Sequence, residues 1–148
     1  MGTYDELSVG DRFHTPARVL DDASVRSLIE LGGFTHPLFT DPAVAAASGF
    51  SKTPVPGQAL LMVMGGLVEQ TGRFDDTVVA LTGFDSVRFL KPAFAGDSLM
   101  TEVEVLSKEP TPSGGRAVML MAWRCVKPGG ELVVEATARM LFKTGRRS

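Results

Sequence analysis

Few residues in this sequence can carry out acid–base, nucleophilic or metal chemistry. His14 and His36 are the only histidines, and Cys125 is the only cysteine. A transition-metal site needs several such ligands at close spacing, so we expect neither a metal nor another cofactor. Cys125 stands in an apolar segment with no histidine near it in the sequence, which is typical of a core residue rather than a nucleophile.

The polar residues best suited to chemistry lie in a short loop, Thr35–Thr40. An unperturbed histidine titrates near neutrality, so a histidine at position 36 could position a water molecule or act as a base, or His36 could tie the loop together. Thr35 could supply a hydroxyl, although threonines in loops usually bond locally. Asp41 precedes Pro42, which is typical of a helix cap, and a role as general base stays open.

Backbone groups offer a second kind of chemistry at Gly57, where an apolar segment begins after Pro56. The first turn of a helix has N–H groups without intrahelical acceptors and a partial positive charge. Such donors stabilise an oxygen on which negative charge develops. Gly57 could equally do no more than let the chain turn. Gln58 could orient a water molecule or bond to nearby backbone.

Hydrophobic patterns indicate the helices that position these groups. Asp21 or Asp22 caps a helix that ends at Gly32-Gly33, and a second, short helix begins at Asp41-Pro42. The segment Gly57–Gln70 is apolar nearly all round, so other structure must wrap it. Even extended to Gly72 it would be only about 24 Å long, too short to span a membrane.

The rest of the chain predicts an antiparallel sheet around that helix, in a single α+β domain over residues 1–148. The third of the four expected strands is apolar on both faces, so it should be central or at an interface. With 44% apolar and 22% charged residues, the composition is that of a globular protein. The expected strands are Thr77–Leu90, Asp97–Ser107, Arg116–Lys127 and Glu131–Lys143.

The net charge and the cysteine content limit which binding partners and which cellular compartment we expect for this protein. The net charge is −2 with no long basic run, so we expect no nucleic acid partner. The beginning of the chain has no basic start followed by an apolar run, so we expect no signal peptide and no membrane partner. A single cysteine suits a reducing compartment, and we expect a cytoplasmic protein.

Two stretches carry a resemblance to a known family, the MaoC-like branch of the hot-dog fold. VRFLKPAFAGDSL (Val87–Leu99) is similar to the family pattern R-F-x-x-P-V-x-x-G-D-x-L, and GFTHPLFTD (Gly33–Asp41) to the loop G-D-x-N-P-x-H-x-D of R-specific enoyl-CoA hydratases. The resemblance extends over essentially the whole chain. It implies a sheet wrapped around a long central helix, whose start binds a thioester oxygen. It also implies a homodimer or higher homo-oligomer, joined edge to edge.

The same resemblance shows where the hydratase dyad is replaced. The aspartate position holds Phe34, the histidine position holds Phe39, and His36 stands at the asparagine position. A phenyl ring can neither accept nor donate the proton that hydration requires. Together with the adaptable Met62, the two rings either favour a bulky hydrophobic or aromatic acyl group or are plain core residues.

We therefore expect a hot-dog thioesterase that hydrolyses an acyl-CoA or acyl-carrier thioester. Gly57 would polarise the carbonyl, while Gln58, His36 and Thr35 hold water. The alternatives are an R-specific enoyl-CoA hydratase or dehydratase, and a non-catalytic acyl-thioester-binding subunit. Arg88 and Lys91 could meet the phosphates of the carrier or form a solvated strand face. The residues that we expect to bind substrate are Phe34, Phe39, Pro56, Met62, Arg88 and Lys91.

Overall fold

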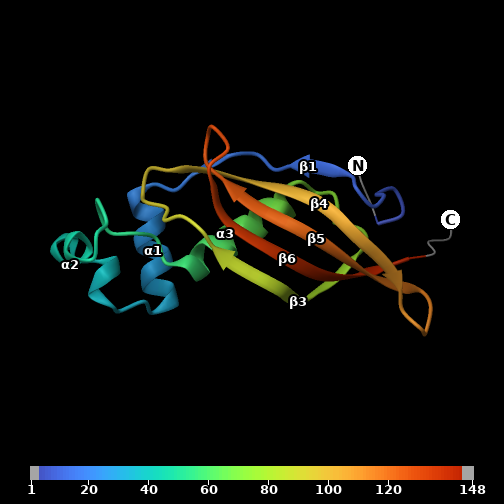
Figure 1. The fold of residues 1–148 in the computed structure, drawn as a ribbon. Coiled ribbons are helices and arrows are strands. Elements are labelled where there is room, and N and C mark those ends of the chain that lie inside the picture. The colour runs from blue at the N-terminus through green and yellow to red at the C-terminus, as the bar shows by residue number, and fades with distance from the viewer. Residues whose placement is uncertain (1–3, 145–148) are drawn as a thin grey trace.

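The protein is a curved antiparallel sheet with one long helix against its inner face, as the computed structural model of residues 4–144 shows (Figure 1). The shorter helices lie together beyond one end of the sheet. The helices are α1 (Asp22–Gly32), the 3-10 helix η1 (Pro37–Phe39), α2 (Pro42–Ala47) and α3 (Gly57–Gln70). The strands are β1 (Arg12–His14), β2 (Arg18–Val19), β3 (Val78–Phe89), β4 (Ser98–Pro110), β5 (Arg116–Val126) and β6 (Leu132–Lys143). This is the α+β hot-dog fold that the sequence predicts.

Strand β5 lies at the centre of the sheet, in the order β1-β4-β5-β6-β3, with β2 also paired to β4. Every pairing is antiparallel. Met119, Met121 and Trp123 are alternate residues of β5, and all three are buried. The sequence predicts that this strand is either central or at an interface, and the structure places it at the centre, with a neighbour on each side.

Helix α3 packs on the sheet through one row of large side chains. Leu60, Met64 and Leu67 are each at most 2% exposed. Gly65 lets the helix approach the sheet, because a Cβ there would lie 3.3 Å from the ring of Trp123. Met62, however, is 56% exposed, so the expectation of a helix wrapped on every side is wrong for a single chain. Within residues 4–144, the Met62 side chain is left largely uncovered, on the side of α3 that faces α1.

The ends of the helices follow from local chemistry. Asp21 caps α1 by accepting a 2.7 Å hydrogen bond from the Ser24 amide, and Gly33 ends it with φ of 71°, a conformation that glycine favours. Asp41 caps α2, accepting from the Ala43 amide at 2.9 Å. Both aspartates therefore act as the helix caps that the sequence predicts.

Helix α3 is the longest helix between residues 4 and 144, and it has 14 residues. A membrane-spanning helix needs about 20 apolar residues. No helix in the described part of the chain is long and apolar enough to cross a bilayer.

Candidate functional site

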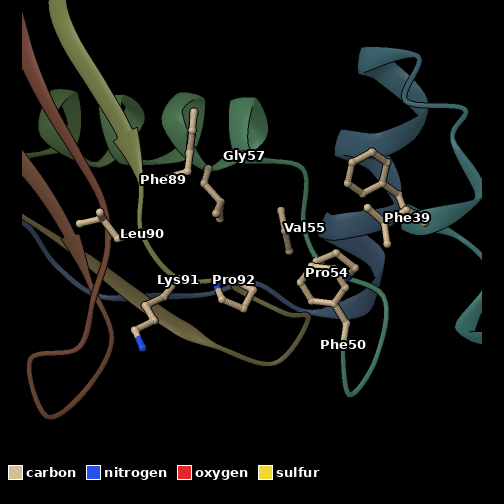
Figure 2. A pocket seen from close by; sticks show the side chains of 11 residues that line it. Phe39, Phe50, Pro54, Val55, Gly57, Phe89, Leu90, Lys91 and Pro92 are labelled. Atoms are coloured by element: carbon tan, nitrogen blue, oxygen red, sulfur yellow. The ribbon is translucent and has the colours of Figure 1, made fainter. Parts of the chain in front are cut away.

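A cavity of about 310 Å³ lies where the first turn of α3 meets the end of β3 (Figure 2). Its walls come from η1, the loop that leads into α3, and the segment that follows β3. Lys91 is the only titratable residue of the lining, so the cavity is apolar with one cation at its wall. The lining residues are Leu38, Phe39, Phe50, Pro54, Val55, Gly57, Leu60, Phe89, Leu90, Lys91 and Pro92.

The start of α3 places backbone donors at this cavity. Pro56 is the N-cap residue, and no side chain caps the helix. The first intrahelical bonds are donated by the amides of Ala59 and Leu60 to the Pro56 carbonyl, at 3.0 and 3.2 Å. The N–H groups of Gly57 and Gln58 precede these bonds and stand at the positive end of the helix. Of these two residues Gly57 lines the cavity, so its amide can donate to an oxygen bound there.

Gly57 has a packing requirement as well as a chemical one. A Cβ at this position would lie 2.9 Å from the ring of Phe89, a distance that side chains do not adopt without a shift. Figure 2 shows the Phe89 ring against the first turn of α3. Because Gly57 has no side chain, the Phe89 ring can pack directly against the start of the helix. Both alternatives for Gly57 remain compatible with this geometry.

Backbone hydrogen bonds hold the two walls in place. The Val55 amide donates to the Ala93 carbonyl at 2.8 Å, which ties the loop before α3 to the segment after β3. The amides of Leu90 and Lys91 both donate to the Val133 carbonyl of β6, at 2.8 and 3.3 Å. These main-chain bonds fix the segments that carry the cavity walls relative to one another.

The two phenylalanines at the dyad positions contact each other. The ring centroids of Phe34 and Phe39 are 5.8 Å apart with the planes at 75°, an edge-to-face contact. Phe34 packs directly on Gly32, whereas Phe39 lines the cavity. The structure therefore brings the two positions together, with only the second at the cavity wall.

His36 stabilises its own loop. Its Nδ1 accepts a hydrogen bond of 3.0 Å from the Leu38 amide and so caps η1. A neutral imidazole that accepts at Nδ1 carries its hydrogen on Nε2, so this arrangement presents a donor rather than a base. His36 and Thr35 are exposed and do not line the cavity. The geometry supports the loop-tying interpretation, and the catalytic role of both residues stays a prediction.

The remaining predicted residues are spread over the surrounding surface. Gln58 and Arg88 are exposed, and neither lines the cavity. Pro56 is buried behind the start of the helix, and Met62 lines a separate groove between α1 and α3. Of the ten residues that the sequence singles out, the cavity brings together Phe39, Gly57 and Lys91.

Sequence reasoning missed two aromatic walls of the cavity, Phe50 and Phe89. Phe89 lies inside the family pattern VRFLKP, so its position could have drawn attention to it. Phe50 stands in a loop with no pattern around it. Within residues 4–144, His, Cys, Asp and Glu form no group of three that could hold a metal ion.

A sheet curved around one helix, with an apolar cavity at the helix start, defines a protein of the hot-dog fold. Residues 9–115 match the MaoC like domain, and the chain belongs to this MaoC-like family. The family membership confirms the resemblance found in the two sequence stretches.

Two curated relatives are similar to this chain in sequence. The (R)-specific enoyl-CoA hydratase of Aeromonas caviae is 29% identical over 133 residues, which cover 89% of this chain and 92% of the hydratase. Protein MaoC of Klebsiella aerogenes is 29% identical over 100 residues, 68% of this chain. This chain spans only 29% of the length of Protein MaoC.

Solved structures agree with these relatives. A monoamine oxidase regulatory protein from Archaeoglobus has a TM-score of 0.88 at 25% identity, with 97% of this chain and 95% of that chain covered. The A. caviae hydratase has a TM-score of 0.69 at 28% identity, with 93% and 96% covered. These comparisons favour the hydratase class over the thioesterase that we expected first from the sequence.

Proposed function

We propose that this protein binds a 2-enoyl or 3-hydroxyacyl thioester in the cavity at the start of α3 and catalyses R-specific hydration or dehydration. The observation that carries the proposal is the uncapped first turn of α3, which meets an apolar cavity at Gly57. The 29% identity with the A. caviae hydratase over nearly its whole length supports the reaction class.

The amides of Gly57 and Gln58 would act on the thioester carbonyl. In hydration, the water oxygen bonds to the β-carbon, the carbon–carbon double bond is lost, and negative charge moves to the thioester oxygen. The water loses one proton as its oxygen bonds to the β-carbon, and a proton adds to the α-carbon, so that the elements of water add across the double bond. Hydrogen bonds to that oxygen stabilise the charge as it develops, and one such donor is worth about 10²- to 10³-fold in rate.

Proton transfer is the step that this chain supports least. Phe34 and Phe39 occupy the positions of the family's acid and base, and the cavity lining holds no carboxylate or imidazole. A positioned acid–base group contributes typically 10²- to 10⁴-fold. We therefore expect hydration to be slower by about that factor than in a relative with both dyad residues.

The cavity walls suggest the kind of substrate. Phe39, Phe50 and Phe89 form three aromatic walls, which suit a bulky hydrophobic or aromatic acyl group. Lys91 lies at the cavity and Arg88 is exposed three residues earlier. These two cations would meet the phosphates of coenzyme A or of a phosphopantetheine arm.

Thioester hydrolysis is the second candidate, and one observation favours it. The backbone donors remain while no acid–base group lines the cavity, and hydrolysis can draw on carbonyl polarisation and a positioned water. The pure protein should be incubated with saturated and 2-enoyl-CoA esters. Loss of enoyl absorbance without free thiol supports hydration, and release of thiol from saturated esters supports hydrolysis. Binding measured by calorimetry without either reaction would indicate a binding subunit.

The open edge of the sheet supports a homodimer. Among residues 4–144, strand β3 pairs with β6 alone, and it carries exposed apolar side chains at Val79, Leu81 and Phe89. Pairing of two β3 edges would satisfy the free main-chain groups and cover these side chains. Light scattering should give twice the monomer mass, and a monomer at working concentration would contradict this assembly.

A further inference from the structure

Phe39 stands between two cavities. The first is the 310 Å³ cavity at the start of α3. The second, of about 370 Å³, lies against α1. Phe39 is the one residue that lines both. Figure 2 shows its side chain beside the short helices, across the cavity from Gly57 and Phe89.

The ring of Phe39 is held in this position from two sides. It makes the edge-to-face contact with Phe34, and the His36 ring also meets it edge to face, with ring centroids 6.5 Å apart. Its backbone is part of η1, where the Phe39 amide donates to the His36 carbonyl at 3.1 Å. These contacts restrict the movement of the Phe39 side chain.

The second cavity offers an apolar surface on α1, beside the polar side chains of Thr40 and Thr53. Val25 and Ile29 of α1 face it, and Val25 is only 8% exposed. The charged residues of its lining, Asp22, Arg26 and Glu30, are all exposed. The exposed charges can stay in water while a chain that passes Phe39 meets the apolar side chains of α1.

We propose that Phe39 sets the length limit of the acyl group, because its ring closes the first cavity against the second. This inference rests on the proposed function, since it assumes that the first cavity holds an acyl thioester. Removal of the ring would join the two spaces into one of roughly twice the volume, and longer straight-chain acyl groups would then fit.

Calorimetric binding of a series of saturated straight-chain acyl-CoA esters tests this inference independently of turnover. For wild-type protein, each added methylene should tighten binding by about fourfold until the cavity is full, and further methylenes should then give no gain. In Phe39→Ala the gain should continue for several more carbons, so that esters beyond the wild-type limit bind at least about tenfold tighter.

Phe50→Ala is the matched control, because Phe50 lines the first cavity and not the second. It should weaken binding of all esters by a similar factor and leave the limit at the wild-type length. Thermal unfolding should show that each variant is folded. If Phe39→Ala is not, Phe39→Leu keeps an apolar side chain in the loop and should move the limit in the same direction by a smaller amount.

Two outcomes would overturn the inference in distinguishable ways. A wild-type limit that stays unchanged in a folded Phe39 variant would show that Phe39 is not the partition, while binding itself would still support the proposed function. If no ester of any length binds wild-type protein, the proposed function is wrong, and so is the inferred length limit.

Discussion

The rings of Phe34 and Phe39 meet edge to face, with centroids 5.8 Å apart, at the two positions where MaoC-like hydratases carry their aspartate and histidine. The contact shows that the loop still brings these positions together, although neither side chain can transfer a proton. The loop therefore keeps the two dyad positions in contact, with only Phe39 at the cavity wall.

Restoring both residues should create acid–base catalysis. We expect Phe34→Asp combined with Phe39→His to raise 2-enoyl-CoA hydration by about 10²- to 10⁴-fold, the usual contribution of such groups. Loss of enoyl absorbance measures it, with each single variant as a control. Thiol release should not rise. An unchanged hydration rate in a folded double variant would contradict the proposed reaction class.

A side chain at Gly57 should damage the site more than the loss of any neighbouring side chain. In Gly57→Val, the branched side chain would collide with Phe89, since even a Cβ would lie 2.9 Å from its ring. We expect acyl-CoA binding to weaken by about tenfold, because a hydrogen-bond donor that becomes inaccessible costs up to about 1.5 kcal/mol.

Gln58→Ala is the matched control for Gly57→Val, since it keeps the amide N–H and its side chain lies outside the cavity lining. Binding should be unchanged, as measured by calorimetry. A loss of binding in Gln58→Ala as large as that in Gly57→Val would argue against a role of the backbone donors.

Asp41 should contribute to stability rather than to catalysis. Its carboxylate accepts from the Ala43 amide at 2.9 Å and caps α2, so Asp41→Ala should lower the free energy of unfolding by about 1 kcal/mol. Asp41→Asn keeps an accepting oxygen and should lower it less. Urea unfolding measures both. Complete loss of activity in a normally folded Asp41→Asn protein would instead identify Asp41 as the general base.

Cys125 should make stability depend on alkaline pH. Burial raises the pKa of this thiol to about 11, an effect that the charge of Lys127 partly offsets. In the unfolded chain the thiol titrates near about 8.5, so above that pH the folded state binds more protons and stability falls as pH rises. The loss should reach up to about 3 kcal/mol by the folded pKa, at about 1.4 kcal/mol per pKa unit.

The comparison of wild-type protein with Cys125→Ala isolates this effect. Urea unfolding at several pH values from about 8 to about 10.5 should show a steeper decline in wild type than in the variant, because only wild type carries the titrating thiol. Parallel declines would show that the thiol ionises as easily in the folded protein as in the unfolded chain.

The sequence by itself determined the features that depend on neighbours in the chain. The bounds of α3, Gly57–Gln70, follow from one continuous apolar segment, and the caps at Asp21 and Asp41 follow from side chains that bond two or three residues onward. The double apolar pattern of β5 determined its central place. Short entry strands such as β1 had no comparable signal, because three residues are too few to show a period.

Only the tertiary structure decided which residues share the cavity. Phe39, Phe50 and Phe89 come from three separate segments, and the Val55–Ala93 backbone bond ties the loop after Phe50 to the segment after Phe89. Periodicity reports which face of an element is apolar, but it carries no information about which distant segment that face meets. For this reason Gly57 could be found at the helix start from the sequence, whereas the position of Phe39 between two cavities could not.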